Sequence, residues 1–137
     1  MMPDYLEAFA AAFLDVLRHA RGSAFSVRPI KLLRRARELG YRVDVNPTYA
    51  SVMRHYIEVL GKVYPYEVWY GSRGRLYIFE RGDFKGLESL TPGQFARILK
   101  AIEEGASGPL NLNNALRRYF KLVGPPIMVS QPHLLNY

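Results

Sequence analysis

Apolar residues recur at steps of three and four along much of this chain, which is the spacing of an amphipathic helix. The first such stretch runs from Pro3 to about Ala20 and is followed by Gly22. A proline fits the first turn of a helix, and a glycine is a common stop after the last turn. The sequence therefore predicts a core helix here, and its apolar stripe consists of Leu6, Phe9, Ala10, Phe13 and Leu17.

Two more helices are predicted close together, over Val27–Leu39 and Pro47–Leu60. Gly40 and Gly61 follow them and are expected to end them. Asn46 is expected to cap the second helix, because its side chain can accept a hydrogen bond from an amide of the first turn. Each helix has an apolar stripe, so both are expected to pack on the core with one side in water.

The segments beside these two helices are expected to be short and extended. Ala24–Ser26 is predicted as a short strand, and Tyr41–Val45 as a brief extended connection between the helices. Ser26 is also expected to cap the helix that follows it. The predicted order is thus helix, strand, helix, helix.

A β-hairpin is predicted after these helices. Tyr64–Tyr70 and Arg75–Glu80 are rich in aromatic and β-branched residues, and they flank a turn at Gly71–Gly74. Because both faces would carry apolar residues, neither face is expected to be fully polar. One face would hold Val68, Tyr70, Leu76 and Ile78, and the other Trp69, Tyr77 and Phe79.

The last third of the sequence predicts two helices and a tail. Thr91 and Gln94 form a capping-box pattern, which starts a helix that runs to Glu104. A further helix is expected over Leu112–Val123, and the segment 125–137 that follows is apolar but broken by prolines.

A length of 137 residues suits one domain with a single core. We predict an α+β, mostly helical fold in which residues 1–88 form the core. Residues 89–137 would add a C-terminal helical extension and tail, packed on that core as part of one domain.

The charge is strongly positive and unevenly distributed. Lysine and arginine outnumber aspartate and glutamate by 19 to 12, which gives a net charge of +7. Eleven of the basic residues lie between Arg21 and Arg75, an interval that holds only four acidic ones. A regional excess of this kind favours a basic face that binds nucleic acid. The alternative is a solvated surface rich in arginine.

Several classes of protein are disfavoured by composition. The chain has no cysteine, which excludes disulfides and thiolate metal sites. The apolar segment Ala8–Leu17 is too short to span a bilayer and contains Asp15, so we expect a cytoplasmic protein that does not bind membranes. Abundant arginine and tyrosine without cysteine would also suit a thermophile.

No catalytic pattern stands out in the sequence. His19, His55 and His133 lie on separate predicted elements without the spacing of metal ligands. There is no glycine-rich phosphate loop, nucleophile elbow or paired-carboxylate motif. We therefore expect a protein that is not an enzyme and that needs neither a cofactor nor a metal.

The predicted order of elements over residues 3–82 resembles the winged helix-turn-helix superfamily of DNA-binding domains. The resemblance rests on Phe25-Ser26-Val27 and Asn46-Pro47-Thr48, which open the two central helices, and on the wing that closes with Arg73-Gly74-Arg75-Leu76-Tyr77. Tyr56–Gly61 leads into this wing. The pattern departs from the family at Tyr41–Val45, which is longer than the usual tight turn.

The resemblance implies that the helix Pro47–Leu60 enters the major groove and that its outward side chains reach base edges. The implied base readers are Thr48, Ser51, Arg54 and His55. Arg54 would contact a guanine, because its planar guanidinium matches two adjacent acceptors. The phosphates would be neutralised by Arg28, Lys31 and Arg35, and the wing tip would contact the backbone or the minor groove through Arg73 and Arg75.

The expected function is double-stranded DNA binding by a small transcriptional regulator, and two other functions remain open. Single-stranded DNA or RNA could bind the hairpin at 64–80, where bases would stack on Trp69, Tyr77 and Phe79 beside the arginines. A winged helix could also be a protein-interaction module that docks through the tail 125–137. A homodimer through residues 89–137 is a further expectation.

Overall fold

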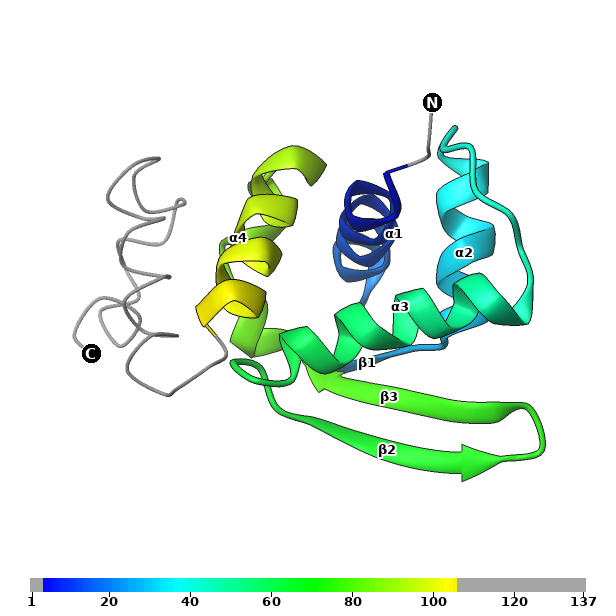
Figure 1. The fold of residues 1–137 in the computed structure, drawn as a ribbon. Coiled ribbons are helices and arrows are strands. Elements are labelled where there is room, and N and C mark those ends of the chain that lie inside the picture. Colours follow the sequence, from blue (N-terminus) through cyan, green and yellow to red (C-terminus); the bar gives the residue numbers. More distant parts are fainter. Residues whose placement is uncertain (1–3, 106–137) are drawn as a thin grey trace.

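Four helices and a small antiparallel sheet make up the part of the chain that the computed structural model describes, residues 4–105 (Figure 1). The fold is α+β and mostly helical, and within these residues no helix is long and apolar enough to cross a membrane. The elements are α1 (Tyr5–His19), β1 (Ala24–Val27), α2 (Pro29–Glu38), α3 (Pro47–Leu60), β2 (Tyr66–Gly71), β3 (Gly74–Glu80), the 3-10 turns η1 (Arg81–Phe84) and η2 (Leu87–Ser89), and α4 (Pro92–Glu104).

The expected helix Leu112–Val123 and the segment 125–137 lie outside the described residues. Only the first helix of the predicted extension, α4, is described; it packs against α1, and its residues Phe95, Ile98 and Ile102 are buried.

The sheet has the strand order β1-β3-β2, and both neighbouring pairs are antiparallel. β1 is thus joined to the hairpin through β3. Paired residues of an antiparallel sheet share a face, so Phe25 and Val27 of β1 lie on the same face as Phe79 and Tyr77 of β3. All four of these side chains are buried, and this face of the sheet is therefore part of the core.

The predicted assignment of the hairpin residues to faces is wrong. Gly71 and Gly74 pair across a turn of two residues, which places Tyr70 opposite Arg75, Val68 opposite Tyr77 and Trp69 opposite Leu76. Val68 and Tyr70 therefore share the face of Tyr77 and Phe79, whereas Trp69 lies on the opposite face. The turn accommodates this pairing because Gly74 has a φ of +92°, a conformation that favours glycine.

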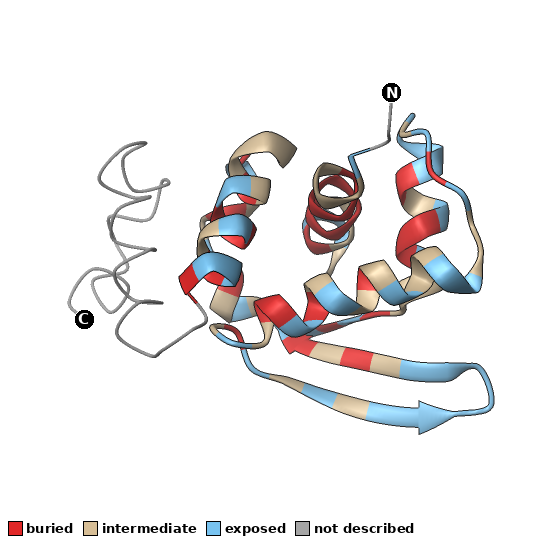
Figure 2. Ribbon diagram, viewed as in Figure 1, coloured by how far each residue is buried: buried red, intermediate tan, exposed pale blue. Residues whose placement is uncertain are grey.

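Phe13 of α1 lies at the centre of the core. Its ring centroid is between 5.3 and 5.8 Å from the centroids of five other phenylalanine rings, and it is fully buried. The five rings come from α1, β1, β3, η1 and α4, and they belong to Phe9, Phe25, Phe79, Phe84 and Phe95. One aromatic side chain thus joins the helices to the sheet, and Figure 2 shows the buried positions concentrated where these elements meet.

Local capping patterns were predicted with mixed success. Asn46 accepts a hydrogen bond from the Tyr49 amide at 3.0 Å, and Thr91 and Gln94 form the complete capping box, so both of these predictions are confirmed. The prediction that Ser26 caps α2 is wrong. Ser26 lies within β1, opposite Ile78, because the strand continues to Val27, and Arg28 is the residue that precedes α2.

The connection between α2 and α3 has no regular secondary structure. Val43 is buried, and its carbonyl accepts hydrogen bonds from the Arg37 guanidinium at 3.1 and 3.3 Å. The backbone amide of Asp44 donates a hydrogen bond to the Tyr5 hydroxyl at 3.2 Å. These contacts hold in place a connection that is longer than a tight turn. Arg37 therefore has a structural role.

Tyr64 gives the fold a specific dependence on alkaline pH. Burial raises the pKa of its hydroxyl, and the Asp83 carboxylate adds to the rise. The unfolded chain loses this proton above about pH 10 and the folded chain does not, so stability should fall by about 1 kcal/mol per pH unit above that value. Tyr64→Phe should remove this contribution in urea unfolding between pH 9 and 11. The exposed control Tyr70→Phe should not, and an unchanged slope in Tyr64→Phe would contradict the assignment.

Candidate nucleic-acid interface

The basic side chains expected to neutralise phosphates differ in their surroundings. Lys31 is exposed on α2. Arg28 is half-buried at the start of α2, and its Nε is shielded from water without a hydrogen-bond partner among the described residues. Arg35 lies 2.7 Å from Asp15 of α1 in an ion pair. Because that carboxylate compensates its charge, Arg35 has a structural role and is removed from the candidate interface.

The exposed side of α3 carries three of the four expected base readers. Thr48, Ser51 and His55 are exposed, and the Ser51 hydroxyl donates to the Pro47 carbonyl at 3.3 Å. His55 is bound to another helix, because its Nε2 lies 2.6 Å from Oε2 of Glu103 on α4. A base edge would have to compete with this carboxylate, so we also remove His55 from the candidate interface.

Arg54 lies on the side of α3 that faces the hairpin. Residues seven apart share one side of a helix, and Gly61, seven residues after Arg54, packs against the ring of Tyr66 on β2. Arg54 is half-buried and forms no ion pair or hydrogen bond with residues 4–105. Glu58 is also near the hairpin: burial raises the pKa of Tyr66, and the Glu58 carboxylate raises it further.

The end of the hairpin presents two exposed arginines and one exposed tyrosine. Arg73 lies in the turn, and Arg75 follows it on β3. The guanidinium carbon of Arg75 is 5.6 Å from the centroid of the Tyr70 ring, which is a cation–π contact. Tyr70 is 76% exposed although it shares a face of the hairpin with the buried Tyr77 and Phe79, because it lies near the turn at the end of β2.

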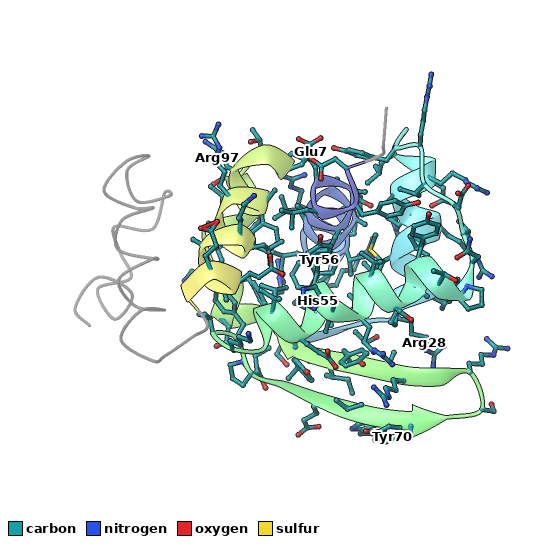
Figure 3. The ribbon with its side chains drawn as sticks, in the orientation of Figure 1. Glu7, Arg28, His55, Tyr56, Tyr70 and Arg97 are labelled. Atoms are coloured by element: carbon teal, nitrogen blue, oxygen red, sulfur yellow. The ribbon has the colours of Figure 1, made fainter. Side chains whose placement is uncertain are left out.

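Arg28 lies near the end of the hairpin that carries Arg73 and Arg75. Pairing of β1 with β3 ends at Val27 and Tyr77, so the chain leaves the sheet at Arg28 near the end of β3 that carries Arg75. Figure 3 shows Arg28 between α3 and β3, and Tyr70 on β2 below them. We use the name basic edge for the five cations that remain in the candidate interface, which are Arg28, Lys31, Arg54, Arg73 and Arg75.

The prediction that bases could stack on the hairpin is wrong for two of its three residues. Tyr77 and Phe79 are 1% and 0% exposed, because their face of the sheet packs on the core, so no base can reach them. Trp69 is 61% exposed. Trp69 and Tyr70 are neighbours on one strand, so their side chains point to opposite faces of the sheet. The exposed aromatic residues therefore do not form a row on one face, which single-strand stacking would need.

Among residues 4–105, no three or more His, Cys, Asp or Glu side chains are grouped so that they could hold a metal ion. His19 lies next to Asp15, at 3.5 Å, and His133 is outside the described residues. Comparison with known proteins adds no further guide: no family model matches the sequence, and neither a curated protein nor a solved structure matches it.

Proposed function

We propose that this protein binds double-stranded DNA and regulates transcription, acting by binding and not by catalysis. The order of elements from α1 to β3 supports this proposal, since it is the order on which the resemblance to winged helix-turn-helix domains rests. In that arrangement α3 would lie in the major groove and the end of the hairpin would lie over the backbone or the minor groove.

The basic edge is the observation that carries the proposal. Its five cations come from α2, α3 and the hairpin, and none of them forms an ion pair with a carboxylate of residues 4–105. Elsewhere Arg35 is paired with Asp15, and Arg18 and Arg37 hold backbone carbonyls. These three arginines stabilise the fold, whereas the five cations of the basic edge have no acidic partner within residues 4–105.

The proposed roles follow from the chemistry of these side chains. Lys31 and Arg73 are exposed and would neutralise phosphates, for which charge suffices without exact geometry. Arg54 would read a guanine through its two parallel N–H groups. Thr48 and Ser51 lie on the exposed side of the same helix and could contact neighbouring base edges or phosphates.

A salt titration of binding to random-sequence duplex and single-stranded DNA of equal length tests this function. We expect the duplex to bind more tightly, and its affinity to fall with salt with a slope of about −0.9 for each phosphate contacted in a plot of log K against log salt. Three to five contacts from the basic edge would give a slope of roughly −3 to −5. Tighter binding of the single strand, or no binding to either at low salt, would overturn the proposal.

A further inference from the structure

β2 forms an edge of the sheet whose outer side pairs with no other described strand. Gly71 and Gly74 are the bonded pair that closes the turn, and bonded pairs alternate along an antiparallel ladder. Trp69 and Glu67 therefore bond to β3, whereas Tyr66, Val68 and Tyr70 direct their backbone N–H and C=O groups outward. The edge thus offers three residues with backbone groups available for pairing with another strand.

This edge lacks the features that usually prevent strands from pairing. β2 is six residues long, its only charged residue is Glu67, and it contains neither proline nor lysine. The other edge strand, β1, has only four residues and is followed within two residues by Pro29. Two of the three large apolar side chains exposed in residues 4–105 are on β2, and these are Trp69 and Tyr70.

We propose that two copies of this protein pair through β2, antiparallel and centred on Val68, to form one six-stranded sheet. Val68 then faces Val68 of the second copy, and the outward backbone groups of both strands bond to each other. Tyr66 faces Tyr70 of the second copy, and Glu67 faces Trp69. Because Trp69 and Tyr70 lie on opposite faces, this arrangement covers exposed apolar surface on both faces of the joined sheet.

The chemistry of β2 favours a second copy in this register. The indole Nε1 of Trp69 already lies 3.4 Å from Oε2 of Glu67 within the chain, and the proposed register places the second copy's Glu67 directly opposite the indole. A register centred on Glu67 would instead set two carboxylates against each other, which is unfavourable. Facing Tyr66 and Tyr70 rings add an aromatic pair at each end. The strand is therefore complementary to itself.

The self-association of the full chain, measured by sedimentation over a wide concentration range, tests this inference. We expect a monomer–dimer equilibrium without nucleic acid. Trp69 is the only tryptophan, so its emission should shift to shorter wavelength as the dimer forms. A chain that remains monomeric with unchanged emission would overturn the inference. Because no DNA is present, the result is independent of the proposed DNA binding.

Charge variants test the register. In Trp69→Glu each new carboxylate would face Glu67 of the other copy, twice by symmetry, and the dissociation constant should rise at least about tenfold. The double variant Glu67→Lys with Trp69→Glu should recover most of this loss, because each Lys would then face a Glu. If Trp69→Glu dimerises like the original chain, or if the double variant is as weak as the single one, the register is wrong.

A proline variant tests whether backbone pairing is the cause. The Tyr70 amide points outward, so Tyr70→Pro removes two interchain hydrogen bonds by symmetry while it leaves those between β2 and β3 in place. We expect this variant to stay folded by circular dichroism and to be monomeric where the original chain is dimeric. A dimer that survives Tyr70→Pro would place the contact elsewhere, for example in residues 89–137, and would overturn the inference.

Discussion

Phe13→Ala is expected to lower the free energy of unfolding by about 3–5 kcal/mol, the usual cost of removing a fully buried phenylalanine from a core. The Phe13 ring contacts rings of the sheet, of η1 and of α4. Its removal therefore weakens the packing between the helices and the sheet. The surrounding rings are held by separate elements and can close the cavity only in part. Urea unfolding followed by circular dichroism measures the loss.

The control for this prediction is Tyr70→Ala, measured with both proteins dilute enough to be monomeric, which removes an aromatic ring of similar size from an exposed position. It should change the stability by less than about 0.5 kcal/mol, as most surface substitutions do. Phe13→Leu provides a measurable intermediate if Phe13→Ala does not fold, with an expected loss of about 1–2 kcal/mol. A loss below about 1 kcal/mol in Phe13→Ala would mean that Phe13 is not the centre of the core.

The sequence predicts that Phe13 is buried, but not which residues it contacts. The spacing of α1 predicts that Phe13 faces inward, because helical periodicity is a local property of the chain. Its ring contacts with Phe79 and Phe95 depend on how the sheet and α4 pack around α1. Caps such as Asn46 and Thr91 were predictable for the same reason as the stripe, since each involves residues only three apart.

The hairpin shows where local reasoning fails. Composition located both strands to within two residues at each end, but the assignment of faces depends on which two residues form the last bonded pair of the turn. A shift of one residue transfers every side chain to the opposite face. This is why Trp69 was assigned to the face of Tyr77 and Phe79, which instead carries Val68 and Tyr70.

The sequence predicted which residues could form the candidate interface, but not which of them are free of an acidic partner. A helical pattern places Arg35 and His55 at partly exposed or exposed positions, yet it cannot show that a carboxylate lies beside them. Their partners, Asp15 and Glu103, are 20 and 48 residues away in the sequence. Ion pairs between helices are set by tertiary packing, and only the structure separates these two residues from the basic edge.

Reversal of three charges of the basic edge should weaken duplex DNA binding by about a hundredfold or more at low salt. The variant combines Lys31→Glu, Arg73→Glu and Arg75→Glu, and all three residues are exposed, so the fold should be retained. Each lost phosphate contact removes a favourable interaction and also lowers the steepness of the salt dependence by about 0.9. Fluorescence anisotropy with a labelled random-sequence duplex measures both quantities.

The matched control is a second triple variant with the same change in net charge, made of Lys85→Glu, Arg97→Glu and Lys100→Glu. These residues are also exposed. Lys85 follows η1, beyond the end of β3 opposite the turn, and Figure 3 shows Arg97 on α4, far from the hairpin. If DNA responds only to the overall charge of the protein, both triples will lose affinity equally. If the basic edge is the contact surface, the first triple variant should lose at least tenfold more affinity for the duplex than the control. The salt dependence should become less steep only in the first triple variant. Equal losses would exclude the basic edge as the binding surface even if the protein binds DNA.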